Sequence, residues 1–151
     1  MHDSVTVHMA ASPQVVWDLL SDVTRIGELS PETFEGEWLA GASAPAVGAK
    51  FRGHVRRNGR GPTYWTICRV THCEPGAVFA FDVLGPADRV VNSWRYDLTA
   101  AADGTDVTES FRLADNPLTK LYWAIAGRWR GRTNRAGMRA TLERAKAIVE
   151  A

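Results

Sequence analysis

The sequence predicts an α+β fold: a curved antiparallel sheet of about seven strands wrapped on a long C-terminal helix, with two short helices after the first strand. Three observations lead to this prediction. Apolar residues recur at helical spacing over 116–150, with no proline after Pro117. Six segments between residues 34 and 113 alternate apolar and polar side chains. A chain of 151 residues with 45% hydrophobic and 23% charged residues is typical of one globular domain, 1–151.

The N-terminal part predicts one strand and two short helices. Residues 4–9 alternate with the period of a strand. Ser12 can cap a helix and Pro13 suits its first turn, and apolar residues follow at helical spacing. A second short helix is expected over 24–29, because Pro31 pushes the residue before it out of the helical conformation.

Residues 34–113 are expected to form the rest of the sheet. Glycine, proline, asparagine and aspartate gather between the alternating segments and predict turns. Because these connections are short, successive strands should be antiparallel neighbours. The expected strands are 34–40, 49–57, 63–72, 77–84, 89–99 and 106–113.

The C-terminal segment is the partner that such a sheet needs. A helix over 116–150 would be roughly 50 Å long at 1.5 Å per residue. Its N-terminal half is rich in aromatic residues and needs a large apolar surface, while a lone antiparallel sheet cannot bury both faces. The sheet is therefore expected to curve around the helix. Gly127 and Gly131 weaken the helix locally and predict a bend between them.

Several motifs carry a family resemblance that covers essentially the whole chain. They are ASPQVVWDLLSD at 11–22, GAKFRG at 48–53, WTICRV at 65–70, EPG at 74–76, FAF at 79–81, WRY at 94–96 and GTDVTES at 104–110. The chain resembles the START-like superfamily, also called SRPBCC or polyketide cyclase/dehydrase-like proteins. The resemblance implies a helix-grip (START/Bet v 1-like) fold with a deep apolar cavity between sheet and C-terminal helix. It also implies binding of lipids, polyketides or quinone-like molecules, in some members with cyclisation or dehydration, but it transfers no catalytic set to this chain.

Strand alternation and helix spacing nominate the residues that would line such a cavity. Six tryptophans in 151 residues are more bulky aromatic side chains than packing alone usually requires. For any single residue, ordinary core packing remains the alternative. The candidate ligand-binding residues are Trp65, Ile67, Phe79, Phe81, Trp94, Tyr96, Glu109, Phe111, Tyr122, Ile125 and Trp129.

Glu109 is the main polar candidate, because it lies on the apolar face of its predicted strand. A buried carboxylate must be paired or protonated. Glu109 could orient a ligand through an ion pair or act as a general acid or base of raised pKa, and a structural salt bridge or an outward twist is the alternative. His54 is a second catalytic candidate, with a solvated sheet face as its alternative. The expected partners of Glu109 are Arg52, Arg56, His54 and Arg95.

Charge is distributed unevenly along the chain. The net charge is +1, but residues 117–151 carry eight basic and two acidic residues, a net charge of +6. A solvated helix face or a transient contact with an anionic membrane or acidic partner would explain this excess. Nucleic acid is not expected, because Trp129 should face the core while Arg128 and Arg132 share another face.

Other chemistry finds little support in the sequence. The four histidines show no paired ligand spacing, so no metal site is expected, and no motif indicates a cofactor. Cys68 and Cys73 should point to opposite faces of one strand and remain unbridged, as in a reduced cytoplasmic protein. No signal pattern or run of 18 apolar residues is present.

Three functions stay open at this point. The first is sequestration or transport of a hydrophobic small molecule in the cavity. The second is an enzymatic one, a cyclase or dehydratase acting on polyketide-like substrates. The third is a protein-interaction module that uses the basic helix, which a filled core without a cavity would favour.

Overall fold

The computed structural model describes residues 2–57 and 60–151, without the side chains at 118, 119, 122, 123 and 126–131. Seven strands form one antiparallel sheet in the order β1-β7-β6-β5-β4-β3-β2. The strands are β1 His2–Met9, β2 Thr33–Trp38, β3 Lys50–Val55, β4 Tyr64–Glu74, β5 Val78–Leu84, β6 Val90–Ala101 and β7 Gly104–Leu113. The helices are α1 Pro13–Ser21, α2 Ile26–Leu29 and α3 Pro117–Val149, with 3-10 turns η1 Val23–Arg25 and η3 Pro86–Asp88.

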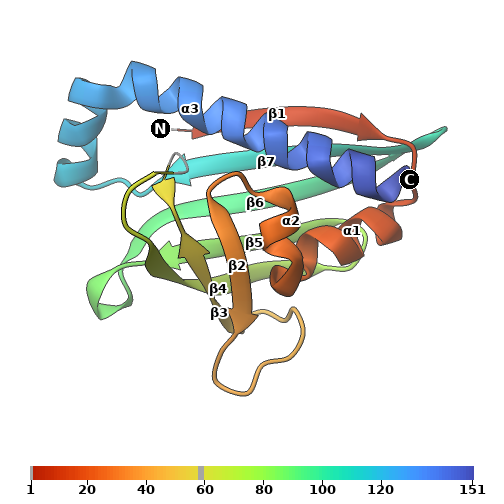
Figure 1. Cartoon of the computed structure of the whole chain (residues 1–151), viewed down its shortest axis with the longest axis horizontal. Helices are drawn as coiled ribbons and strands as arrows, with labels where there is room; N and C mark the ends of the chain where they lie inside the picture. Colours follow the sequence, from red (N-terminus) through yellow and green to blue (C-terminus); the bar gives the residue numbers. More distant parts are fainter. Residues whose placement is uncertain (1, 58–59) are drawn as a thin grey trace.

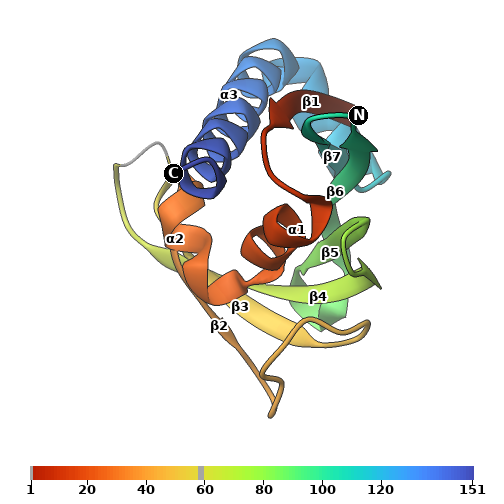
Figure 2. The same ribbon diagram turned by 90° about the vertical axis from the view of Figure 1, so that its right-hand side faces the viewer.

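The predicted fold class is confirmed. The sheet curls around α1, and α3 lies along the side that the sheet leaves open, packing against β1, β7, α1 and α2 (Figures 1 and 2). Only the boundaries differ: the second short helix begins as the 3-10 turn η1, and the strands shift by a few residues at their ends. Figure 1 also shows a bend in the N-terminal half of α3, the half in which the glycines predict one. No helix among the described residues is long and apolar enough to cross a membrane.

Local chemistry explains how α1 is placed. The Ser12 side chain accepts a hydrogen bond from the backbone N–H of Val15 at 3.4 Å and caps the helix, as the sequence predicts. Trp17 is buried, and its indole N–H donates to the backbone oxygen of Val78 in β5 at 2.9 Å. This bond satisfies the polar atom of a core aromatic side chain and fixes α1 against the sheet.

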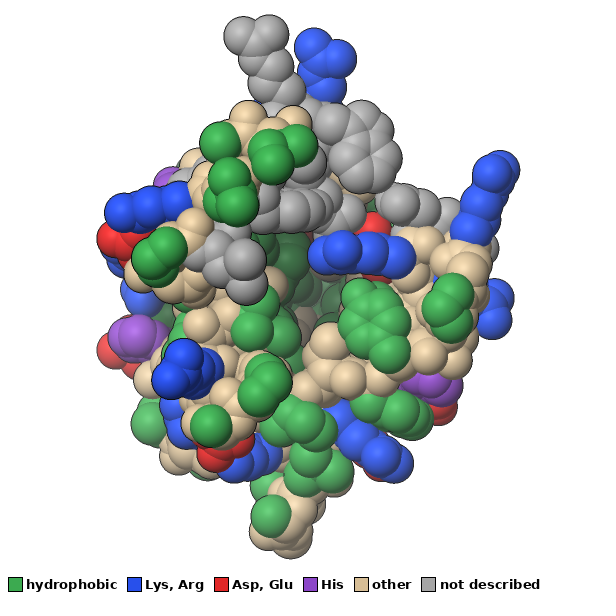
Figure 3. Space-filling model, turned by 90° about the vertical axis from the view of Figure 1, so that its left-hand side faces the viewer, with side chains coloured by type: hydrophobic (Ala, Val, Ile, Leu, Met, Phe, Trp, Pro, Cys, Tyr) green, Lys and Arg blue, Asp and Glu red, His purple; other side chains and the backbone are tan. Residues whose placement is uncertain are grey.

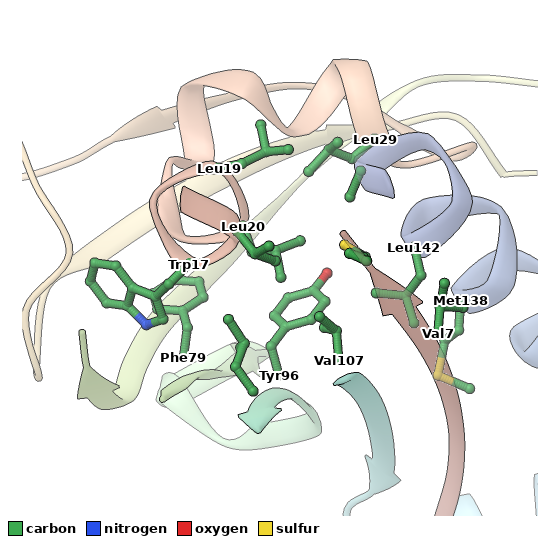
Figure 4. Packing of buried hydrophobic residues seen from close by; sticks show 14 of the residues in the cluster. Val7, Trp17, Leu19, Leu20, Leu29, Phe79, Tyr96, Val107, Met138 and Leu142 are labelled. Atoms are coloured by element: carbon green, nitrogen blue, oxygen red, sulfur yellow. The ribbon is translucent and has the colours of Figure 1, made fainter. Parts of the chain in front are cut away.

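The hydrophobic core fills one end of the sheet. Side chains from α1, β5, β6, β7 and the C-terminal half of α3 meet there (Figure 4). Met138, Leu142 and Ala145 of α3 are completely or almost completely buried. In the N-terminal half of the same helix, Leu121 is 59% exposed and Ile125 is 80% exposed. The C-terminal half of the helix therefore anchors it in the core.

A β-bulge in β4 corrects the prediction for the two cysteines. Cys68 pairs with Val83, but the register shifts between Val70 and His72, so that Cys73 pairs with Phe79. Because Val83 and Phe79 lie on the same face of β5, the bulge brings both cysteines to the inner face of the sheet, whereas simple alternation had placed them on opposite faces. Both thiols are free, as expected.

Two glycines make a matched pair of stability predictions. A methyl group at Gly27 in α2 would overlap the backbone carbonyl of Phe34, while at Gly137 in α3 its nearest contact is Pro31 Cγ at 3.8 Å. Gly27→Ala is therefore expected to lower the free energy of unfolding by about 2 kcal/mol. Gly137→Ala should raise it by about 1 kcal/mol, because alanine is the better helix former. Urea denaturation measures both, and equal effects of the two changes would contradict this packing.

Candidate functional site

A cavity of about 630 Å³ lies between the inner face of the sheet and the helices. Its size is in the usual range for a small-molecule site. The sheet contributes the aromatic side chains of the wall, and α1, η1, α2 and α3 contribute aliphatic ones such as Leu20, Val23, Leu29 and Met138. Residues of the C-terminal half of α3 that line it are Thr133, Asn134, Gly137, Met138 and Thr141, and Leu121 and Ile125 line it from the N-terminal half.

Most of the predicted lining residues are found in the cavity wall. Those that line it are Phe79, Phe81, Trp94, Tyr96, Glu109, Phe111 and Ile125. Within the wall, the rings of Trp94 and Phe111 pack together across β6 and β7 with centroids 4.8 Å apart. Tyr122 and Trp129 were predicted to join them, but their side chains lie outside those that the structure describes.

Trp65 and Ile67 were wrongly placed in the cavity. On β4 the residues that line it are Tyr64, Thr66 and Cys68, which alternate with the two predicted ones. The register explains this, because Cys68 pairs with the buried Phe51 of β3 and shares its face. The inward and outward residues of β4 were therefore exchanged in the prediction, because the outward-facing Trp65 and Ile67 are hydrophobic as well.

The outer face of β4 has its own packing partners, which include the catalytic candidate His54. The imidazole of His54 stacks on the indole of Trp65 with ring centroids 4.1 Å apart, and the guanidinium carbon of Arg52 lies 4.0 Å from the Trp65 ring centroid. The Nδ1 atom of His54 also lies 2.7 Å from a carboxylate oxygen of Glu35. His54 therefore faces away from the cavity, and the solvated-face alternative is correct for it.

Glu109 lies inside the cavity wall, and its partner is a residue that the sequence did not suggest. It is directly opposite Tyr96 in the β6–β7 ladder, and the Tyr96 hydroxyl donates to its Oε1 atom at 3.2 Å. The Glu109 side chain is 3% exposed. Burial raises its pKa from the ordinary 4.5 to about 8, and the hydrogen bond from Tyr96 offsets only part of that increase. The carboxyl group is therefore mostly neutral at pH 7.

None of the predicted basic partners reaches Glu109. Arg52 pairs with Glu37, Arg95 pairs with Asp97 at 2.9 Å, and His54 pairs with Glu35, all on the outer face of the sheet. Arg56 lies over the ring of Phe34. Alternation explains the error, because side chains on neighbouring positions of a strand point to opposite faces. Since no described cation pairs with it, Glu109 avoids the cost of burying charge by holding its proton.

The remaining reactive groups offer little chemistry. Cys68 lines the cavity, but burial raises the pKa of its thiol to about 12, which makes it a poor nucleophile. Among the described residues, no three His, Cys, Asp or Glu side chains are grouped so that they could bind a metal ion.

The cavity opens at the end of the molecule where α3 begins. Tyr64, Val91, Leu121 and Ile125 line it and are at least 38% exposed, and we call these four residues the opening. Arg57 at the end of β3 also contributes. Figure 3 shows this end hollowed, with hydrophobic side chains in the depth and several basic ones around it.

Comparison with known proteins agrees with this geometry. Residues 2–150 match the model of the family described as polyketide cyclase / dehydrase and lipid transport. The chain belongs to this family. This match confirms the START-like superfamily that the sequence motifs indicate, and the structure has the helix-grip fold expected from that resemblance. No curated protein matches the chain in a sequence search.

Solved structures share this fold. The Polyketide_cyc-like protein Cgl2372 from Corynebacterium glutamicum is 26% identical, with a TM-score of 0.63 over 99% of this chain and 91% of that one. Protein CV1439 from Chromobacterium violaceum is 15% identical, with a TM-score of 0.72 over 99% and 98%. The di-domain ARO/CYC protein StfQ of the steffimycin biosynthetic pathway is 15% identical, with a TM-score of 0.77 over 99% of this chain and 50% of that one.

Proposed function

We propose that this protein binds a hydrophobic small molecule, such as a lipid, polyketide or quinone-like compound, and sequesters or carries it. The observation that supports the proposal most is the cavity of about 630 Å³ with its aromatic and aliphatic wall. Desolvation of apolar ligand surface would drive binding, at about 25 cal/mol per Å² before ordering costs. The neutral Glu109 carboxyl would hydrogen-bond a polar group of the ligand.

An enzymatic function of the cyclase or dehydratase type is the second candidate. It is favoured by Glu109, because a carboxylic acid that keeps its proton at pH 7 can act as a general acid. A Glu109 in contact with His54 or an arginine would favour such chemistry, and a purely apolar tunnel would favour transport. Among the described side chains, the hydrogen-bond partner of Glu109 is Tyr96, so the wall is less equipped than an acid–base pair and more polar than a tunnel.

The third candidate, an interaction module with a filled core, has lost the observation that would favour it. The opening instead suggests how a hydrophobic ligand could be loaded. Leu121 and Ile125 are exposed there, and the basic Arg57 lines the same cavity. Apolar side chains next to cationic ones suit the surface of an anionic membrane, and we include transient contact with such a membrane in the proposal.

Two tryptophans on opposite faces of the sheet test the proposal, one in the cavity and one as its control. Trp94 lines the cavity, and Trp65 lies on the outer face of the sheet. Trp94→Ala is expected to weaken binding of the neutral fluorescent probe N-phenyl-1-naphthylamine about fivefold or more, because the probe loses an aromatic contact. Trp65→Ala should change the affinity less than twofold.

Fluorescence titration of both variants, after circular dichroism has confirmed their folding, measures these affinities. A wild-type protein that does not bind the probe at all would refute the proposed function. Equal loss in both variants would show that the probe binds somewhere other than the cavity.

A further inference from the structure

Two side-chain oxygens in the cavity wall are buried without a hydrogen-bond partner among the described residues. They are Oε2 of Glu109 and Oδ1 of Asn92, and both residues line the cavity. A buried polar atom without a partner destabilises a folded protein, so such atoms usually mark a place where a ligand or water binds. Asn92 was missed in the sequence, although it continues the alternation of Trp94 and Tyr96 by one more step.

The two oxygens belong to opposite ends of one row of side chains. Asn92, Trp94 and Tyr96 follow one another on the inner face of β6, and Glu109 lies opposite Tyr96. Four residues of strand separate Asn92 from Tyr96, which corresponds to about 13 Å. Between them lies the ring pair of Trp94 and Phe111. The wall thus has a polar group at each end and an aromatic surface in the middle.

The two ends offer different hydrogen bonds. Glu109 carries a proton at pH 7, because its pKa is about 8, and can donate to an acceptor on a ligand. The amide oxygen of Asn92 can only accept. A carboxylate ligand held between these two groups would lie against the rings of Trp94 and Phe111, and burying an unpaired charge costs far more than burying a neutral group.

We propose that the cavity selects a neutral, elongated ligand with a hydrogen-bond acceptor such as a ketone at the Glu109 end and a donor such as a hydroxyl at the Asn92 end. The apolar body of the ligand lies against Trp94 and Phe111. This inference rests on the proposed function, since it concerns the same cavity. It makes Asn92 and Glu109 the residues that determine specificity, and it disfavours carboxylate ligands.

A series of compounds with equal chain length tests the inference in the wild-type protein. The series is 12-hydroxydodecan-2-one, dodecan-2-one, dodecan-1-ol and dodecanoate, each used to displace N-phenyl-1-naphthylamine. The hydroxyketone is expected to bind about tenfold tighter than dodecan-2-one, which lacks the hydroxyl group. This is the effect expected when the hydroxyl donates a hydrogen bond to the buried oxygen of Asn92. Dodecanoate should bind weakest of the four.

Two variants assign each hydrogen bond to its residue. Asn92→Leu should abolish the advantage of the hydroxyketone over dodecan-2-one while both still bind. Glu109→Gln should still bind the hydroxyketone more tightly than dodecan-1-ol, which lacks the ketone, because an amide N–H also donates a hydrogen bond. Glu109→Leu should bind these two compounds equally. Each result is the ratio of two affinities, those of two compounds for the same variant. A mutation that weakens the binding of all compounds equally therefore leaves the ratio unchanged.

The outcomes separate this inference from the function beneath it. Equal affinity of the wild-type protein for the hydroxyketone and the ketone, or tightest binding of dodecanoate, would overturn two-point selection and leave hydrophobic binding intact. Failure of the fluorescent probe itself to bind would overturn the proposed function.

Discussion

Glu109→Gln is expected to remove a fall in stability between about pH 4.5 and pH 8. In the unfolded chain the carboxyl group ionises near pH 4.5, while in the folded protein it holds its proton to about pH 8. Between these values the folded state binds one proton more than the unfolded state. Stability from this group is therefore fully present below pH 4.5 and is lost as the pH rises to about 8, by about 1.4 kcal/mol per pH unit at most.

Urea denaturation of both proteins from pH 5 to pH 8.5 measures this effect. The wild-type free energy of unfolding should fall relative to that of the glutamine variant by several kcal/mol in total. Glu143→Gln, at an exposed position of α3, is the control and should follow the wild-type curve. Parallel curves for wild type and Glu109→Gln would mean that Glu109 is ionised or solvated in the folded state.

A side chain placed in the cavity is expected to displace its ligand. Gly137 lines the cavity from α3, and a Cβ atom there meets only Pro31. Gly137→Phe should therefore fill the cavity without moving the helix, and it should lower the affinity for N-phenyl-1-naphthylamine at least tenfold. Ala136→Phe adds the same ring at an exposed neighbouring position and is the matched control.

Probe titration and thermal denaturation together test this variant. Gly137→Phe should melt at or above the wild-type temperature, because a glycine is removed from a helix and a void is filled. Unchanged probe affinity in a well-folded Gly137→Phe protein would exclude the cavity as the binding site.

The fold was predictable because its signals are local and redundant. The cap at Ser12, the alternation of the strands and the helical repeat after Pro117 each predict an element that the structure contains. The phase of one strand was not predictable. Trp65 was assigned inward by alternation, but it stacks on His54 and contacts Arg52 on the outer face, where it is 38% exposed.

The site was predictable only in part for a related reason. Burial of Glu109 followed from its place between two apolar residues of the same strand face. Its partner depended on which residue of β6 stands opposite, a matter of register that one strand alone does not reveal. The bulge in β4 that turns Cys73 inward is equally invisible to simple alternation.

The most direct test of the account is a crystal structure of the protein with N-phenyl-1-naphthylamine. The account predicts one probe molecule between the sheet and α3, with its rings against Trp94 and Phe111 and its amine within reach of a wall oxygen. A cavity filled by the protein's own side chains, or a probe bound only on the outer face of the sheet, would contradict it.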